Sequence, residues 1–245
     1  MRVILTLLLT CISSLATGET PLLPNYVATY SATFNGMPID VTRKLSRTAD
    51  GYAVTVTAKN WLGSMQEIET FHIDRKDRIL VDSYSSQRLF FGVSRRENLV
   101  IDRARALALY DAKKKHREIP FLDNYFGPLG YQLQMSRDLA KTQNKYCYQV
   151  LMRGKVKDYC FEPTGAQVLD TALGEINTVQ MRRIREDQQR ETVFWLAPQW
   201  DYLLVKLWQK EEDGETYEII LSAATVDGKQ LRAYYPADTN ATAAH

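Results

Sequence analysis

Two cysteines, Cys147 and Cys160, flank the pattern that most constrains how this chain can fold. The segment Tyr146–Phe161 predicts two strands that meet at a turn over Arg153–Gly154. A two-residue turn centred there places Cys147 opposite Cys160 in a non-hydrogen-bonded pair, where Cα atoms lie about 4.5 Å apart. Because a disulfide accepts that separation, we predict a cross-strand Cys147–Cys160 disulfide.

Other uses of the two cysteines lack the partners that they would need. The histidines are His72, His116 and His245, and none stands at a ligand spacing from either cysteine. A redox pair is more usually spaced Cys-x-x-Cys. We therefore expect a structural disulfide, with no metal site and no cofactor.

The first residues have the composition of an export signal. Met1–Arg2 is a short basic start, and Val3–Leu15 is an apolar run of about thirteen residues. Small residues at Ser14 and Ala16 have the spacing that a signal peptidase recognises, so we expect cleavage after Ala16 or Gly18. An exported chain reaches an oxidising compartment, which agrees with the predicted disulfide.

The chain divides into three parts on this interpretation. Residues 1–18 are a cleaved signal peptide, residues 19–235 a single β domain, and residues 236–245 a disordered tail with nothing to bury. Sandwiches and barrels of this size commonly form one domain.

Two alternatives to free release into the periplasm are a retained membrane anchor and lipidation at Cys11. A spanning helix needs roughly 20 apolar residues, and Gly18–Glu19 ends the run earlier. Thr10 is a poor residue just before a lipidated cysteine, so we do not expect a lipid anchor. No other stretch is long and apolar enough to span a bilayer, and we expect no integral membrane segment after cleavage.

The charge balance argues against nucleic acid as a partner. The chain has 31 Lys and Arg against 29 acids, and loss of Arg2 leaves 30 against 29, a formal net charge of +1. Nucleic-acid binding needs a basic face. The basic run Lys113–Arg117 is interpreted as a solvated loop between two strands, and the arginines of Arg182–Arg190 as an ion-paired edge. An anion site at either place is the alternative.

From Tyr26 onward the dominant hydrophobic period is two, which predicts strands. In Pro38–Arg47, for example, Ile39, Val41, Arg43 and Leu45 share one face. We predict a mainly β fold, a curved antiparallel sheet or a partly closed β-barrel built from consecutive hairpins. Besides the cysteine hairpin, the predicted strands are Val27–Asn35, Pro38–Arg47, Tyr52–Ala58, Met65–Ile73, Ile79–Gln87, Arg95–Asp102, Ala106–Lys113, Gln167–Ala172, Ile176–Arg185, Tyr202–Glu212 and Glu215–Ala223.

One segment has a helical period instead. The segment Asp123–Leu139 carries Pro128 near the expected start of a helix, and Tyr131, Met135 and Leu139 fall on one stripe at i, i+4 and i+8. We predict one amphipathic helix that packs against the sheet through this stripe.

The segment Phe194–Leu207 predicts two strands joined at Ala197–Asp201. An Asp213–Gly214 turn then pairs the second strand with the next one, and a two-residue turn there places Trp208 opposite Ile219. Both faces of this hairpin are apolar. It therefore needs cover on both sides from a second layer, the helix, a ligand or a partner.

Several segments, taken in order, resemble a bacterial family known as domain of unknown function 3108. They are YSATFNGMPIDVTRKL with DGYAVTVTA, LGYQLQMSRDL, YQVLMRGKVKDYCFE, LDTALGEINTVQMRR and TVFWLAP…YLLVKLWQKEEDGETYEIILSA, which span most of Tyr26–Ala224. The resemblance implies a secreted or envelope-located, mostly antiparallel β protein of Gram-negative type. It supplies no catalytic residues. Members tend to have a proline where this chain has Leu204, so the resemblance implies a differently shaped corner there.

No motif in the chain identifies an enzyme. Gly-x-Ser-x-Gly, His-Glu-x-x-His and Gly-rich phosphate loops are absent from the sequence. Glu67 and Glu69 share a strand face, an arrangement that would suit a glycosidase only inside a cleft. We assign no catalytic residues and, although the question stays open, we do not expect an enzyme.

Two functions from different classes fit these features. The first is non-catalytic binding of an apolar small molecule or lipid in the concave face of the sheet, beneath the predicted helix. The second is a structural or interaction role, in which a strand edge or an aromatic patch docks an envelope protein partner. Filling of the core is the plain alternative for the aromatic residues. The candidate ligand-binding residues are Trp61, Trp195, Trp200, Tyr202 and Trp208.

Overall fold

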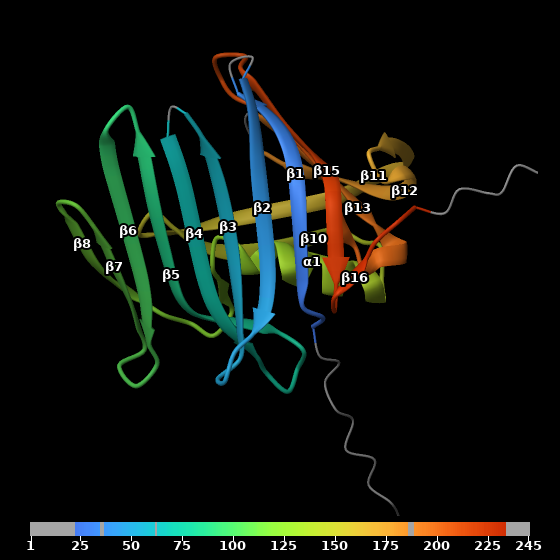
Figure 1. The fold of residues 1–245 in the computed structure, drawn as a ribbon. Helices are drawn as coiled ribbons and strands as arrows, with labels where there is room; N and C mark the ends of the chain where they lie inside the picture. Colours follow the sequence, from blue (N-terminus) through green and yellow to red (C-terminus); the bar gives the residue numbers. More distant parts are fainter. Residues whose placement is uncertain (1–22, 35–36, 62, 186–188, 234–245) are drawn as a thin grey trace, which may run out of the picture.

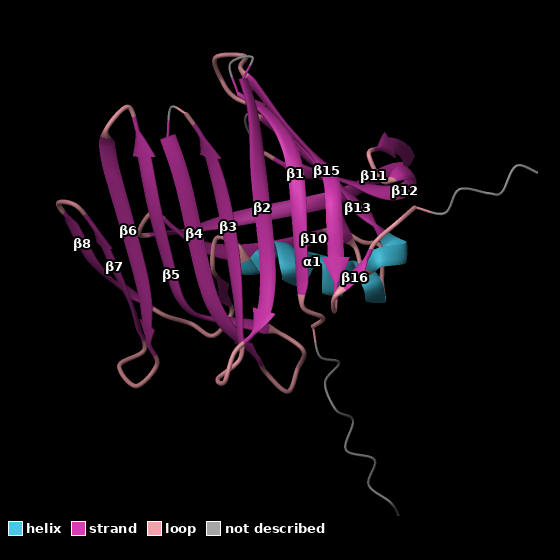
Figure 2. Cartoon of the chain, in the orientation of Figure 1, coloured by secondary structure: helices cyan, strands magenta, loops and turns pink. Residues whose placement is uncertain are grey.

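The computed structural model describes residues 23–34, 37–61, 63–185 and 189–233, which form one long, curved sheet around a helix (Figure 1). Strands make up most of the cartoon in Figure 2. The predicted mainly β fold, with a curved antiparallel sheet and one helix packed against it, is confirmed. The predicted signal peptide at residues 1–18, Cys11 within it, and the predicted tail at residues 236–245 lie outside the described residues.

The sheet runs through fifteen strands in the order β8-β7-β6-β5-β4-β3-β2-β1-β15-β14-β13-β12-β11-β10-β9, and a sixteenth, β16, pairs with β15. The strands are β1 (Tyr26–Phe34), β2 (Met37–Arg47), β3 (Tyr52–Asn60), β4 (Gly63–Ile73), β5 (Ile79–Phe90), β6 (Val93–Asp102), β7 (Leu107–Ala112), β8 (Lys115–Pro120), β9 (Tyr125–Phe126), β10 (Tyr146–Met152), β11 (Lys155–Thr171), β12 (Gly174–Ile184), β13 (Glu191–Ala197), β14 (Leu203–Lys210), β15 (Thr216–Val226) and β16 (Lys229–Gln230). The two helices are α1 (Gly130–Lys141) and the 3-10 helix η1 (Pro198–Trp200).

Consecutive hairpins build almost the whole sheet, as the period-two pattern predicts. In the described part of the chain, every pairing is antiparallel except the short one between β9 and β10. The sheet does not close, because β8 and β9 form its two edges. The first long strand, β1, pairs with the last, β15, so the two ends of the described chain meet in the middle of the sheet.

The cysteine hairpin has the predicted register. Met152 lies opposite Lys155 across the Arg153–Gly154 turn, and Cys147 lies opposite Cys160. The sulfur atoms are bonded at 2.03 Å, and the Cα atoms are 4.0 Å apart. The predicted disulfide is therefore present.

The helix packs through the predicted stripe but begins later than predicted. Tyr131, Met135 and Leu139 are buried against the strands β10 to β13. The helix is predicted to start near Pro128, and α1 begins two residues later, at Gly130, after the short strand β9 at Tyr125–Phe126. Proline disfavours helical backbone in the residue before it, so a helix cannot easily run through Pro128 from upstream.

Strand β11 is longer than the sequence pattern indicates. The pattern separates the cysteine hairpin from a later strand at Gln167–Ala172, whereas the structure joins them into one strand over Lys155–Thr171. The register shifts between Pro163 and Gly165, which marks a bulge in the pairing with β12. A bulge accommodates a proline and bends the strand without ending it.

The hairpin at Asp213–Gly214 has a different register from the predicted one. Trp208 lies opposite Glu218, not opposite Ile219. The turn has three residues between Glu211 and Glu215, with Gly214 at φ 87° as its third residue. A three-residue loop of this kind shifts the pairing by one, which also changes the face partners along the hairpin.

The basic run Lys113–Arg117 is only partly a loop. Lys113 and Lys114 form the turn, while Lys115–Pro120 is the edge strand β8. Its side chains are mostly charged and exposed, which discourages pairing with another chain at this edge. In the other basic cluster, Arg182 pairs with Glu191 at 3.2 Å, as expected of an ion-paired edge.

We expect loss of the disulfide to lower the free energy of unfolding by about 2–3 kcal/mol, because the bond closes a short loop in the unfolded chain. The change is a Cys147→Ser/Cys160→Ser double variant, and the measurement is urea denaturation beside the wild type. Peptide mapping without reduction should recover the two cysteines as one linked pair. Reductant should lower the stability of the wild type to that of the variant and leave the variant unchanged; free thiols at both positions in exported protein would contradict the assignment.

Candidate ligand-binding cavity

The N-terminus of α1 is held by a buried carboxylate from the sheet. Glu69 on β4 is completely buried, and its oxygens accept hydrogen bonds from Leu129 N–H at 2.7 Å and Gly130 N–H at 3.0 Å. Leu129, the residue just before α1, makes no side-chain hydrogen bond that would cap the helix. The first amides of a buried helix need acceptors, and a carboxylate also interacts favourably with the helix dipole. Glu69 therefore fixes where α1 begins.

Two glycines allow this close approach. A Cβ atom added at Gly127 would lie 2.3 Å from Glu69 Cδ, and one added at Gly130 would lie 2.4 Å from Glu69 Oε1. Any larger side chain at either position would push the carboxylate away from the helix amides.

Burial raises the pKa of Glu69 to about 7. The hydrogen bonds from Leu129 and Gly130 and the charge of Arg43 act in the opposite direction, since they favour the ionised carboxylate. Desolvation of a fully buried carboxylate outweighs them.

A buried arginine reaches the same helix end from the neighbouring part of the sheet. Arg43 on β2 is 6% exposed. Its Nε donates to Tyr26 Oη at 2.9 Å, its Nη2 donates to the Leu129 carbonyl at 3.4 Å, and Nη1 donates to Gln132 Oε1. These acceptors are neutral, and the charge of Arg43 favours the ionised form of Glu69, which lowers the pKa of that carboxyl against the effect of burial.

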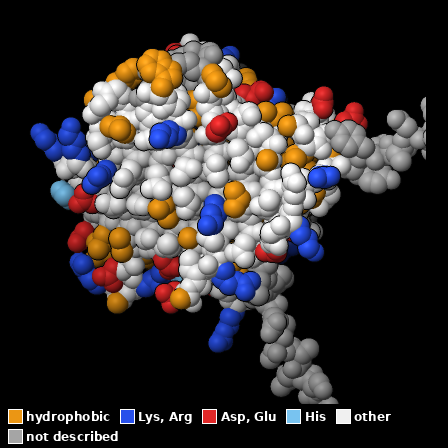
Figure 3. All heavy atoms as spheres, in the orientation of Figure 1, with side chains coloured by type: hydrophobic (Ala, Val, Ile, Leu, Met, Phe, Trp, Pro, Cys, Tyr) orange, Lys and Arg blue, Asp and Glu red, His pale blue; other side chains and the backbone are white. Residues whose placement is uncertain are grey.

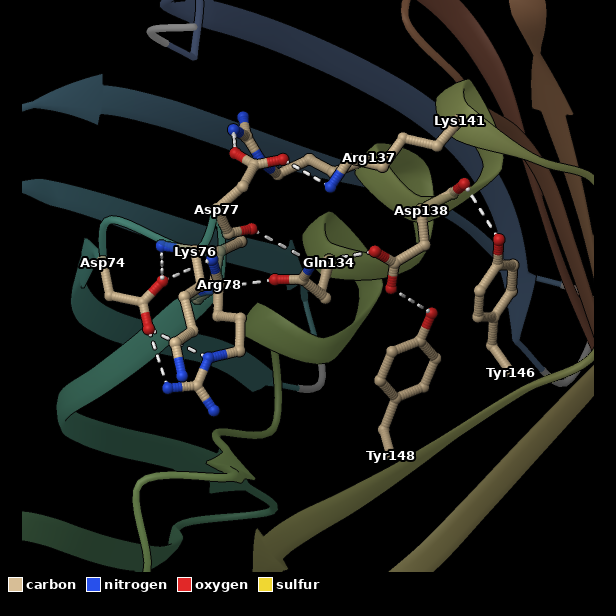
Figure 4. Close-up of polar contacts among 11 residues, drawn as sticks. Asp74, Lys76, Asp77, Arg78, Gln134, Arg137, Asp138, Lys141, Tyr146 and Tyr148 are labelled. Carbon is tan, nitrogen blue, oxygen red and sulfur yellow. Dashed lines mark hydrogen bonds and ion pairs between the residues drawn. The ribbon is translucent and has the colours of Figure 1, made fainter. Parts of the chain in front are cut away.

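The turn between β4 and β5 holds the rest of the helix (Figure 4). Asp77 pairs with Arg137 and, at 2.6 Å, with Lys141 Nζ. Gln134 Oε1 accepts a hydrogen bond from Ile79 N–H at 2.8 Å. These contacts fasten α1 along the wall of the sheet that β4 and β5 form.

The helix also contacts the opposite wall. Asp138 Oδ2 accepts a hydrogen bond from Tyr148 Oη at 3.0 Å, and Tyr146 Oη donates to the Asp138 carbonyl at 3.0 Å (Figure 4). Because both tyrosines lie on β10, the helix is tied to both halves of the curved sheet.

The corner between β13 and β14 completes the surroundings of the helix. Pro198 begins η1, and Asp201 and Tyr202 follow with left-handed backbone at φ 51° and 57°. Tyr202 N–H donates to the Ala197 carbonyl at 2.9 Å, which closes the corner. Ser136 Oγ donates to the Tyr202 carbonyl at 2.9 Å, so the corner is fastened to α1.

A cavity of about 540 Å³ lies between α1, this corner and the ends of β1 and β2. Its walls are mainly apolar side chains: Leu45, Leu133, Met135, Leu196, Trp200, Leu203, Leu204 and Val226 among them. Polar groups also line it: Arg43, Gln132, Ser136, Asp201 and the Asp77–Arg137–Lys141 cluster. An apolar cavity with a few placed polar groups is the usual form of a small-molecule site.

The structure brings two of the five candidate residues to this cavity. Trp200 and Tyr202 both line it. Trp195 is buried in the core and donates from Nε1 to Gln167 Oε1 at 2.8 Å. Trp208 is half-buried against the same core. Trp61 is 81% exposed at the tip of the β3–β4 hairpin and does not line the cavity.

Sequence reasoning did not select the buried ions. Arg43 interrupts the apolar face of Ile39, Val41 and Leu45, and a charge in that position was an available signal. For Glu69 the sequence offers only its place beside Glu67 on one strand face. In the structure the two carboxylates have different partners. Glu69 accepts hydrogen bonds from the first amides of α1, whereas Glu67 pairs with Arg88 at 2.5 Å.

The two histidines in the described part of the chain each contact an aspartate on a neighbouring strand. His72 contacts Asp82 at 3.0 Å, and His116 contacts Asp111 at 2.8 Å. In the part of the chain that the structure describes, no cluster of three or more His, Cys, Asp or Glu side chains could hold a metal ion. Within those same residues, no helix has the length and apolar run needed to cross a membrane.

Comparison with known sequences places the chain in a family without a known activity. A family model described as "Protein of unknown function (DUF3108)" matches residues 29–221. No curated protein matches the sequence.

Among solved structures, the chain is similar to a β-barrel-like protein of domain of unknown function DUF1849 from Brucella abortus. The identity is 9%, the match covers 84% of this chain and 99% of that chain, and the TM-score is 0.56. Similarity at this identity extends to the fold alone. A putative lipoprotein from Parabacteroides distasonis matches at 9% identity over 84% of this chain and 97% of that chain, with a TM-score of 0.33, which is too low to support an argument.

We expect the free energy of unfolding to fall as pH rises from about 4.5 to about 7, because folded Glu69 keeps a proton that the unfolded chain releases. The contribution is fully present below pH 4.5 and amounts to something on the order of 3 kcal/mol. A Glu69→Gln variant should lose this part of the pH dependence, since its amide does not ionise. The measurement is urea denaturation at a series of pH values.

The matched control is Glu118→Gln, which changes an exposed carboxylate on β8 and should keep the wild-type pH profile. Parallel profiles for Glu69→Gln and the wild type would show that Glu69 does not hold a proton in this range.

Proposed function

Because the chain belongs to the DUF3108 family of proteins of unknown function, its role has to be inferred from its own cavity, and we propose that it is an exported protein that binds an apolar or lipid-like ligand there without catalysis. The observation that carries this proposal is the cavity between α1 and the curved sheet, with Trp200 and Tyr202 in its wall. Export to the periplasm is proposed from the apolar leader, and the Cys147–Cys160 bond supports it because disulfides persist in oxidising compartments.

The size of the cavity suits a small molecule or a lipid chain. Its volume of about 540 Å³ falls within the roughly 300–1,000 Å³ typical of ligand pockets. The sheet and α1 are already tied together by Glu69, Asp77 and Asp138, so the walls are largely preformed. A preformed site lowers the ordering cost of binding.

The lining favours binding over chemistry. Among the described residues that line it there is no histidine, cysteine or glutamate; Asp77 is paired with Arg137 and Lys141, and Ser136 Oγ donates to the Tyr202 carbonyl. A nucleophile or general base needs a partner within hydrogen-bond reach. The polar side chains in the wall instead offer donors, Arg43 and Gln132 among them, that could orient the polar end of an otherwise apolar ligand.

We expect an uncharged fluorescent probe, N-phenyl-1-naphthylamine, to bind with a gain in fluorescence, because the cavity removes it from water. An Ala140→Trp variant should weaken binding at least fivefold. Ala140 is an exposed residue of α1 that lines the cavity, so a larger side chain there occupies ligand space without entering the core. The measurement is an equilibrium titration of probe fluorescence.

The matched control is Ala166→Trp, which adds the same side chain at an exposed position on β11 outside the cavity. The control should bind the probe as the wild type does. No fluorescence gain with the wild type, together with no lipid in an organic extract of the purified protein, would overturn the proposal.

A further inference from the structure

The hairpin tips at one end of the sheet carry the most exposed large apolar side chains of the described chain. Trp61 at the β3–β4 tip is 81% exposed, and Phe91 at the β5–β6 tip is 78% exposed. Leu89, Phe90 and Val93 beside them are 41–58% exposed. In Figure 3 hydrophobic side chains gather at the top, over the end of the sheet where these hairpins turn.

The two tips form one surface, which we call the aromatic tip. Gly63 on β4 pairs with Phe90 on β5, so the β3–β4 and β5–β6 turns lie side by side. The packing leaves no space between them, because a Cβ atom at Gly63 would lie 2.0 Å from the Leu89 carbonyl oxygen. The aromatic side chains of both turns therefore reach solvent at the same level.

Basic residues follow directly beneath the aromatic tip. Lys59 lies one residue from the tip end of β3. Arg88 and Arg95 each lie two residues from the tip ends of β5 and β6, and Arg96 lies three residues from the tip end of β6. Arg95 and Arg96 are exposed, and among the described residues no carboxylate lies within ion-pair distance of either. The β7–β8 hairpin turns at this same end of the sheet and adds the exposed Lys114.

Carboxylates near the tip are few. Asp40 on β2 lies opposite Lys59. Glu67, four residues in, is occupied by Arg88 at 2.5 Å. Glu97 lies at the same depth and accepts a hydrogen bond from Tyr110 Oη at 3.0 Å. The residues one to three positions from the aromatic tip therefore carry a net positive charge, although the chain as a whole is close to neutral.

We propose that the aromatic tip is a membrane-contact site, which inserts its aromatic side chains into an anionic lipid surface while the basic residues beneath it bind the headgroups. Tryptophan favours the interface of a bilayer, and each nearby Lys or Arg adds attraction to anionic lipid. A stable protein interface uses about 20–30 residues a side. Two narrow turns offer far fewer, which favours a lipid surface over a protein partner.

The site is separate from the cavity. Tyr26 and Leu45, which line the cavity, pair with each other at the end of β1 and β2 farthest from their shared turn, whereas the aromatic tip lies at the opposite end of the neighbouring strands. Lipid contact would therefore involve the end of the sheet opposite the cavity-lining ends of β1 and β2. The inference goes beyond the proposed ligand binding and does not depend on it.

Co-sedimentation of protein purified after export with lipid vesicles tests the proposal. Vesicles of phosphatidylcholine and phosphatidylglycerol in equal parts should bind at least tenfold more protein than pure phosphatidylcholine at 0.1 M salt, and binding should fall at 0.5 M salt. A Trp61→Ser/Phe91→Asn variant should lose at least tenfold of the anionic-vesicle binding. Asparagine tolerates the left-handed backbone of Phe91, at φ 48°.

An Arg95→Glu/Arg96→Glu variant should lose both the binding and its salt dependence. The matched control is Leu122→Asn/Val168→Ser, which removes two other exposed apolar side chains and should bind as the wild type does. Circular dichroism checks that each variant is folded. The proposal is overturned if the wild type shows no preference for anionic vesicles or if the tip variants bind the vesicles undiminished. It is also overturned if cross-linking in cells joins the wild type to an envelope protein, and the tip variants lose that cross-link but keep vesicle binding.

Discussion

The contact of Glu69 with the first amides of α1 is the interaction on which the interior depends. An unclosed sheet of this length has a concave face that must be covered, and α1 is the element that covers it. Glu69 and Arg43 approach the start of the helix from two different strands and hydrogen-bond to its backbone. Gly127 and Gly130 are required for the same reason, because any side chain there would occupy the place of the carboxylate.

This arrangement also creates the space that we assign to a ligand. The helix is fastened at its start by buried ions and along its length by Asp77 and Asp138. The corner at η1 is fastened to α1 through Ser136 and Tyr202, and the cavity lies between this corner, α1 and the ends of β1 and β2. An apolar residue in place of Glu69 would leave the Leu129 and Gly130 amides buried without an acceptor, which would be costly.

Local patterns predicted most of the fold, and long-range contacts account for what they missed. The disulfide register, the helix stripe and nearly every hairpin follow from spacing along the chain. The three-residue turn at Gly214 and the bulge at Gly165 were missed, because one extra residue in a loop or strand changes register without changing the hydrophobic pattern. For the candidate site, conspicuous tryptophans indicated Trp200, but Arg43 and Glu69 acquire their roles only when separate strands and the helix converge.

The pairing of β1 with β15 has a consequence for the order in which the chain can fold. Its contacts join residues almost two hundred positions apart, such as Ser222 Oγ with the Thr29 carbonyl at 3.0 Å, while most other ladders join neighbours in sequence. Hairpins can form as soon as both of their strands are available, whereas this closure carries the largest loop entropy. A chain that emerges N-terminus first therefore leaves one side of β1 unpaired until nearly all of it has appeared. The two halves of the sheet would assemble early and join last.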